Sequence, residues 1–410
     1  IKILLFIVVQ YWILILMKSV EKKLIIFLFV ITAAQLSYSQ VTLEWAATSS
    51  NFGDYVAIDA ALDSSGNIYV TGMGNGSNNK PDYVTIKYNS SGVREWIARY
   101  TGLLSASDDR PCGIEVDSFG NIYVSGTSGI YGTAVDFATV KYNSSGEQQW
   151  AIRYEGPSRG NIAVSMTSDS QDNLYVCGQS NSLVPTTDYV VVKYNSAGIQ
   201  QWEARYTGGG ISDYNVPKAF TLDHVGNIYI VGYGGGKCIT VKINSSGNFQ
   251  WATRFGINNN NGPATSIITD DSSNVYITGW YVIKYNTMGV EQWSTRFVDA
   301  AASSVIDAFG NLVVTGYVTG DVFPWVNTDI LTRKYNTAGD SVWSVRYSNP
   351  LFREDDGGGG IIKDNFGNFY VSGTSRNNDP GDCITIKYNS SGQQLWTARY
   401  IDNLNNTREY

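Results

Sequence analysis

The chain has 410 residues, of which 43% are hydrophobic and 16% are charged, and its formal net charge is −7. An acidic surface repels phosphate backbones, so this balance argues against nucleic acid as a partner. The four cysteines lie far apart and form no CxxC pair, which argues against zinc, c-type haem and thioredoxin-like sites.

Residues 1–39 are interpreted as sequence that precedes the mature protein. Met17 begins a basic segment, and the apolar run 24–34 follows it; small residues then precede Gln40. This three-part pattern is typical of a secretory signal peptide, with residues 1–16 as translated upstream sequence. The apolar run is short for a membrane span, although an anchor is the alternative. We therefore expect an exported protein, secreted or at the cell surface, without a transmembrane span in the mature chain.

One stretch around a tryptophan recurs through the rest of the chain, first as KYNSSGVREWIARY from Lys87 to Tyr100. Its seven copies lie 42 to 54 residues apart and are marked by Trp96, Trp150, Trp202, Trp251, Trp293, Trp343 and Trp396. A second part, D-x-x-G-N-I-Y-V-x-G, precedes each marker, and its Asp, Asn and last Gly are present in all seven copies. A period of this length indicates a repeat architecture.

Each repeat is predicted to hold four strands, which we name a to d in chain order. In the first copy, strand a ends near Asp63, and strands b, c and d cover 67–72, 85–89 and 95–100. These runs alternate with period two, and turn sequences such as DSSGN and NSSG separate them. We predict an all-β fold, a seven-bladed β-propeller of four-stranded antiparallel blades, as one domain over residues 40–410. A linear β-solenoid is the alternative.

The strands do not divide evenly among seven blades. An eighth marker, Trp45 in VTLEWAA, stands 51 residues before Trp96, so strand d occurs eight times and the other strands seven times. We expect the ring to close at this seam with contributions from both chain ends. An eight-bladed ring in a truncated chain is the alternative.

The stretch DDRPCGIEVDSFGNIYVSGTS, from Asp108 to Ser128, resembles the SBBP repeat, the seven-bladed β-propeller repeat of secreted and surface proteins of bacteria. The resemblance covers nearly the whole mature chain and implies an extracytoplasmic propeller without established catalytic residues. The spacing N-x-x-G-x-x-x-W is also similar, more weakly, to the tryptophan-docking motif of quinoprotein dehydrogenases. Those enzymes use a central acidic calcium site and often adjacent cysteines, and this sequence has no Cys-Cys pair.

A residue present in every copy is more economically a demand of blade geometry than part of a single active site. The Lys and Arg of K-Y-N-x-x-G-x-x-x-W-x-x-R are therefore predicted to be inter-strand or inter-blade partners, with a charged ring around the channel as the alternative. The Asp of D-x-x-G-N is predicted to cap its own turn. Calcium ligation by this carboxylate is the alternative.

Antiparallel strands place the a–b and c–d turns on one face of the disc and the b–c and d–a connections on the other. The second set varies in length and composition, and variable loops on a rigid scaffold are where binding usually occurs. Carboxylates before strand a could form an electronegative mouth for Ca²⁺ or a cationic ligand, unless they belong to the repeat: Asp54, Asp108, Asp109, Asp213, Asp299, Glu354, Asp355 and Asp356. Phe323 and Trp325 lie in a long insertion and suit stacking on a sugar or a protein, with local packing as the alternative.

Enzyme chemistry has little support in the sequence. The one histidine, His224, stands in an a–b turn, where a triad or a histidine-based metal site would have to start from it alone. We therefore predict a monomeric binding scaffold that takes a protein or a carbohydrate through its variable-loop face. One alternative is a carbohydrate-active or quinone-dependent enzyme that uses the mouth carboxylates with calcium. The other is a structural module of a larger surface protein.

Overall fold

The computed structural model describes residues 44, 55–76, 79–103, 107–130, 134–158, 160–181, 186–208, 214–256, 264–297, 299–319, 327–348, 355–375 and 382–400. Within these residues the chain forms seven four-stranded antiparallel sheets and no helix. In each sheet the strands pair in chain order, so every blade is built from one repeat. The described residues thus confirm the predicted all-β propeller fold, with seven blades of four antiparallel strands.

The first three blades follow one another without a strand exchanged between them. Blade 1 consists of β1 (Tyr55–Leu62), β2 (Ile68–Asn75), β3 (Pro81–Tyr88) and β4 (Arg94–Tyr100). Blade 2 consists of β5 (Asp108–Val116), β6 (Ile122–Ile130), β7 (Ala134–Tyr142) and β8 (Gln148–Tyr154). Blade 3 consists of β9 (Ile162–Ser168), β10 (Leu174–Asn181), β11 (Thr187–Tyr194) and β12 (Gln200–Tyr206).

The other four blades repeat this plan, with shorter strands in blade 5. Blade 4 consists of β13 (Val216–Leu222), β14 (Ile228–Gly234), β15 (Lys237–Ile243) and β16 (Phe249–Phe255). Blade 5 consists of β17 (Ser266–Thr269), β18 (Val275–Thr278), β19 (Tyr281–Tyr285) and β20 (Glu291–Arg296). Blade 6 consists of β21 (Ala300–Ile306), β22 (Leu312–Thr319), β23 (Thr328–Tyr335) and β24 (Ser341–Tyr347). Blade 7 consists of β25 (Asp356–Lys363), β26 (Phe369–Ser375), β27 (Asp382–Tyr388) and β28 (Gln394–Tyr400).

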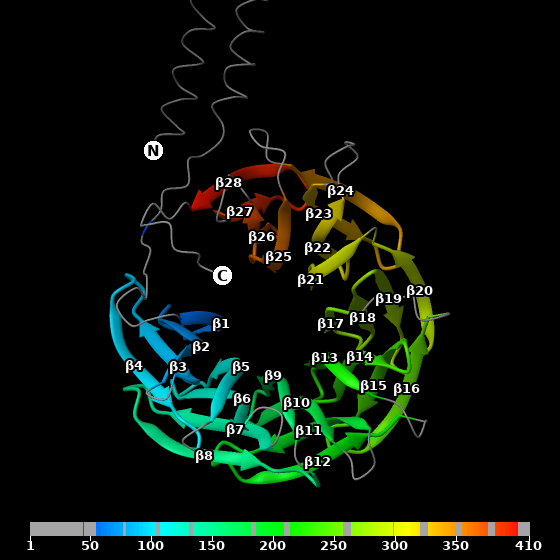
Figure 1. Cartoon of the computed structure of the whole chain (residues 1–410). Coiled ribbons are helices and arrows are strands. Elements are labelled where there is room, and N and C mark those ends of the chain that lie inside the picture. Colours follow the sequence, from blue (N-terminus) through cyan, green and yellow to red (C-terminus); the bar gives the residue numbers. More distant parts are fainter. Residues whose placement is uncertain are drawn as a thin grey trace, which may run out of the picture.

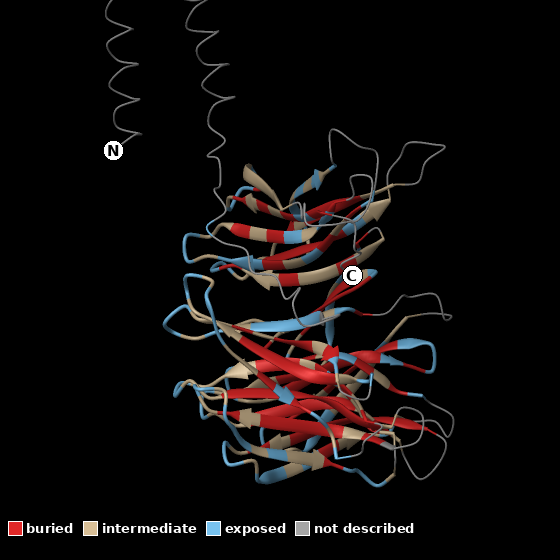
Figure 2. Ribbon diagram, turned by 60° about the vertical axis from the view of Figure 1, so that its left-hand side comes forward, coloured by how far each residue is buried: buried red, intermediate tan, exposed pale blue. Residues whose placement is uncertain are grey.

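The blades stand around a central channel, with strand a innermost and strand d on the outer rim (Figure 1). Each strand a packs on the next one around the ring, from β1 through β5, β9, β13, β17 and β21 to β25. Buried residues concentrate within the blades, while the connections are more exposed (Figure 2). The core therefore lies between blades; Tyr189 of blade 3 and Phe220 of blade 4, for example, share one apolar cluster.

The last glycine of D-x-x-G-N-I-Y-V-x-G lies within strand b in every blade except blade 5, and there it is required because two backbones approach closely. At Gly72, a Cβ atom would lie 2.1 Å from the carbonyl oxygen of Val56 in the paired strand a. The same distance is 2.1 Å at Gly126 and 2.2 Å at Gly178. Strand a carries a β-bulge beside the glycine, between Ala57 and Asp59 in blade 1, which brings that carbonyl inward.

The Asp of each a–b turn caps the turn, as the sequence predicted. In blade 3, Asp169 Oδ1 accepts hydrogen bonds from the backbone N–H groups of Gln171 and Asn173, and Oδ2 accepts one from the Tyr175 hydroxyl. Burial alone would raise the pKa of Asp169, but these bonds and those from the Asn173 amide hold it below its ordinary value. The pKa values of Asp63, Asp223 and Asp307 are lowered in the same way, and that of Asp364 falls to about 2.

The marker tryptophans of blades 1 to 6 each join their blade to the following one. Trp251 of blade 4 donates its indole Nε1–H to the carbonyl of Thr287 in the c–d turn of blade 5, at 3.0 Å. The ring also covers Gly289 of that turn, where a Cβ atom would come within 2.7 Å of it. Lys242 donates to the same carbonyl at 3.3 Å, so this repeated lysine is an inter-blade partner, whereas Lys87 pairs with Glu95 across the strands of its own blade. The indole therefore combines a large apolar contact with one directed hydrogen bond.

The joint predicts a difference between two glycine substitutions. Gly289 and Gly367 have nearly equal backbone angles, φ +78° and +79°, but a Cβ atom at Gly367 would meet nothing nearer than 3.9 Å. Gly289→Ala should therefore lower the free energy of unfolding by about 1–3 kcal/mol more than Gly367→Ala. Urea titration of both variants measures the difference, and equal losses would contradict a close-packed joint.

The capped turns predict a particular acid response. Because the folded pKa values of five turn aspartates lie below the unfolded value, their stabilisation is present above that value and is lost as pH falls through the folded pKa. The melting temperature should change little between pH 7 and about pH 5 and fall steeply below about pH 4. Asp169→Asn should lower the melting temperature at pH 7 and make this fall shallower. Asp271→Asn, at an exposed turn position, is the control, and equal pH profiles would refute the assignment.

Candidate functional site

The two faces of the disc differ as the sequence predicted. On one face, the c–d turns share one geometry, in which Asn89 Oδ1, for example, accepts from the N–H groups of Ser91 and Val93. On the other face the b–c connections range from the two-residue turn Gly235–Gly236, with both φ angles positive, to residues 320–327. We call this second face the variable-loop face.

Half of the predicted ligand-binding residues lie outside the described part of the chain. These are Phe323, Trp325, Asp213 and Glu354, and Asp54 of the acidic set also lies there. The described members are Asp108, Asp109, Asp355 and Asp356, with Asp299 of the wider set.

The structure does not bring these carboxylates together in one described cluster. Asp108 pairs with the guanidinium of Arg110 at 2.6 and 3.0 Å. Asp355 is exposed and accepts from the backbone N–H of Thr328 at 3.0 Å. Asp109 and Asp356 are fully buried. Among the described residues, no group of three His, Cys, Asp or Glu side chains could hold a metal ion.

Sequence analysis missed a second set of aspartates, at the start of strand c. In five blades this residue pairs across the sheet with the repeated Arg of strand d, as with Asp382 and Arg399 at 3.1 Å or Asp136 and Arg153 at 3.3 Å. The signal was available, because an Asp stands 17 residues before the Arg in these five copies. The pairs lie beside the b–c loops, so they fix the base of the variable-loop face.

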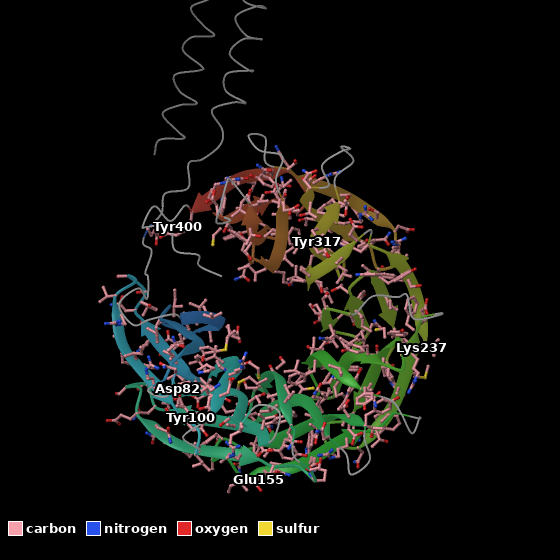
Figure 3. The ribbon with its side chains drawn as sticks, in the orientation of Figure 1. Asp82, Tyr100, Glu155, Lys237, Tyr317 and Tyr400 are labelled. Atoms are coloured by element: carbon pink, nitrogen blue, oxygen red, sulfur yellow. The ribbon has the colours of Figure 1, made fainter. Side chains whose placement is uncertain are left out.

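One joint on this face places two carboxylates near each other. Asp82 of blade 1 is buried, and one of its oxygens has no hydrogen-bond partner among the described residues. Burial raises the pKa of Asp82, and the charge of buried Asp109 in blade 2 raises it further. Figure 3 labels Asp82 within blade 1. At the next joint the arrangement is different, because the Asn161 amide donates to Asp136 at 2.9 Å.

The opposite face carries exposed apolar side chains that the sequence analysis passed over. The a–b turns expose Phe119, Phe309 and Phe366 by 81%, 81% and 90%. The c–d turns expose Ile199 and Met288 by 61% and 71%. The local signal was an aromatic residue just before the turn glycine, in DSFGN, DAFGN and DNFGN.

Groups suited to nucleophilic or acid–base chemistry are scattered through the described residues. His224 is exposed in its a–b turn. Cys177 and Cys238 are buried inside the blades, and burial raises the pKa of Cys112 and of Cys238 to about 12, so these two thiols stay protonated near neutral pH. Cys383 is exposed.

No protein-family model matches the chain. An uncharacterised WD repeat-containing protein of Acanthamoeba polyphaga mimivirus is 27% identical over 386 residues, which are 87% of this chain. The chain spans 23% of the length of that relative. The likeness agrees with a repeat propeller.

Two solved structures resemble the chain at low sequence identity. A protein from Lactobacillus plantarum is 10% identical, with a TM-score of 0.50 over 81% of this chain and 95% of its own. BamB from Moraxella catarrhalis is 10% identical, with a TM-score of 0.46 over 82% and 83%. Identities this low concern the fold alone. Within the described residues, the structure has no helix long and apolar enough to cross a membrane.

The paired carboxylates predict a stabilising substitution. Asp109→Asn removes one of the two buried charges and supplies an amide, as Asn161 does at the next joint. We expect the free energy of unfolding to rise by on the order of 1 kcal/mol at pH 7. The gain should shrink towards pH 4, because a carboxyl with a raised folded pKa costs stability only where it is ionised. The reverse change, Asn161→Asp, should destabilise; a loss in both variants by urea titration would contradict the repulsion.

Proposed function

We propose that this propeller is a monomeric binding module, secreted or at the cell surface, of the SBBP type. Its ligand, a protein or a carbohydrate, binds the variable-loop face. The observation that carries the proposal is the asymmetry between the faces. The c–d turns keep one geometry around the ring, whereas the b–c connections differ from blade to blade. A binding surface can therefore change without disturbing a joint.

The partners of the repeated residues support this reading. The turn aspartates, the marker tryptophans and several of the repeated lysines and arginines have partners within or between blades. Because these groups stabilise the scaffold, we assign ligand specificity to the variable loops. Phe323 and Trp325 are the proposed contacts, because an aromatic side chain presents a large rigid surface to a sugar ring or an apolar protein patch.

An enzyme with a calcium-assisted acidic site is the second candidate, and it takes Asp108, Asp109, Asp213, Glu354, Asp355 and Asp356 as its acidic groups. Burial of Asp109 and Asp356 weighs against an open mouth built from these two carboxylates. A structural module of a larger surface protein is the third candidate. A thermal-shift scan of residues 40–410 separates the first two: calcium or a quinone would raise the melting temperature of an enzyme, and an oligosaccharide that of a lectin-like module.

A comparison between the two faces tests the binding proposal. The double variant Phe323→Ala/Trp325→Ala alters the variable-loop face, and Phe309→Ala/Phe366→Ala alters the opposite face at similarly large aromatic residues. We expect the first variant to weaken binding at least tenfold, which is about 1.4 kcal/mol, and the second to leave it unchanged. The dissociation constants are measured on a glycan array and against cell-surface proteins. Binding lost only in the second variant would place the site on the turn face and contradict the proposal.

A further inference from the structure

The seven described blades are connected by six similar joints. Between blade 7 and blade 1 there is a break in the ring, with no such joint among the described residues. No described strand of blade 7 packs on blade 1 as the other neighbours pack (Figure 1). Figure 3 labels Tyr400 on blade 7 beside this break, whereas Tyr100 of blade 1 lies towards blade 2. The two blades therefore each present one sheet face that lacks a described neighbour.

Blade 1 shows this at the third residue from the end of strand a. Ala60 occupies the position that pairs with Val70 in strand b, and it is exposed. The residues at the same position in the other blades face the preceding blade and are all buried: Ile114, Met166, Phe220, Ile267, Ser304 and Ile361. The exposure of Ala60 thus marks a missing blade on its own side of blade 1.

Blade 7 shows a similar loss of burial on the sheet face that looks towards the break. Ser372 in strand b is exposed, while its six counterparts are fully buried: Thr71, Ser125, Cys177, Val231, Thr278 and Thr315. Cys383 in strand c is exposed, while five of its six counterparts are buried, namely Tyr83, Phe137, Tyr189, Cys238 and Ile330. The sixth, Trp280 in the two-residue b–c turn of blade 5, is exposed as well.

The number of marker tryptophans indicates how many blades the complete ring contains. Each described joint needs one, because the tryptophan of one blade covers the turn glycine of the next: Trp96 on Gly146, Trp150 on Gly198, Trp202 on Gly247, Trp251 on Gly289, Trp293 on Gly339 and Trp343 on Gly392. A ring of seven would use Trp396 on Gly92 of blade 1 and leave Trp45 without a turn. A ring of eight uses Trp45 on Gly92 and Trp396 on the turn of one more blade.

We propose that the break is the site of an eighth blade, whose outermost strand is residues 41–47. Trp45 lies outside the described residues, and the repeat spacing places it one blade before Trp96. Its indole then covers the turn Asn89–Val93 and donates Nε1–H to the Ser90 carbonyl, as Trp96 does to Ser144 at 3.0 Å. The three inner strands come from one further copy of the repeat part a–b–c. This inference concerns the closure of the ring and does not rest on the proposed ligand.

The outer strand is tested by tryptophan substitutions in the chain from residue 40 to 410. Trp96→Ala sets the scale for a complete joint, and Trp280→Ala is a control outside the joints. We expect Trp45→Ala to lower the melting temperature about as much as Trp96→Ala. Trp396→Ala should have a smaller effect, because it loses only its own-blade contact with Tyr370. The opposite order, with Trp396 costly and Trp45 neutral, would establish a ring of seven and overturn the proposal.

A second measurement keeps the test decisive if an alanine variant fails to fold. Gly92→Ala should lower the melting temperature more than Gly66→Ala, which has the same φ of +77° but no tryptophan over it. In the Trp45→Ala background this extra loss should disappear, because the indole that a Cβ atom would meet is gone. An unchanged extra loss in that background would show that another group covers Gly92.

The inner strands are tested through Cys383 in a Cys112→Ser background, since Cys112 is half-buried whereas the thiols of Cys177 and Cys238 are buried. The chain is extended after residue 410 by a copy of its own residues 299–339, which contain no cysteine. We expect the rate of Cys383 modification by Ellman's reagent to fall at least tenfold in the extended chain. An unchanged rate would overturn the inner-strand part of the proposal. Protection that grows with concentration in the unextended chain would instead show a second copy in the break, and would overturn it too.

Discussion

The contact between a tryptophan and the turn of the next blade is the interaction on which the molecule depends. A four-stranded sheet with apolar residues on both faces cannot cover itself, so each blade needs a neighbour on each side. The indole supplies the outer edge of that contact and fixes its register through one hydrogen bond, as at Trp293 and Thr337. The inner strands then complete the core between the same two blades. Every other repeated residue positions a strand or a turn so that this contact can form.

The repeat allowed the fold to be predicted because each of its residues has a local reason. The turn Asp needs partners only two to six residues away. The glycine within strand b is needed because one backbone carbonyl of the paired strand a leaves no space for a Cβ atom. Such interactions lie within one repeat and appear as sequence motifs. The neighbours of Asp82 and Asp136 in the following blade could not be predicted in this way. Whether such a side chain meets a carboxylate or an amide is decided by a residue in the next blade.

The candidate site was harder to predict, because adjacent residues of one segment have opposite environments. Asp355 is exposed and bonded to the backbone of blade 6, whereas Asp356 next to it is buried. The sequence alone does not distinguish these two carboxylates. Their environments differ because strand a begins between them, at Asp356. The exposed phenylalanines of the a–b turns show the converse. Phenylalanine is usually a core residue, yet Phe309 and Phe366 are exposed to solvent because they stand in turns.

Scaffold and recognition surface meet at the start of strand c. There the Asp–Arg pairs, such as Asp188 with Arg205, tie strands c and d together directly beneath the b–c loops. Arg205 also donates to the Tyr154 hydroxyl of the preceding blade, so this base is shared between blades. A loop anchored on such a base can vary in length and sequence without loosening the strands below it. The two faces therefore differ in structural role because of where these interactions lie. The ion pairs lie under the variable loops, and the tryptophans lie against the uniform c–d turns.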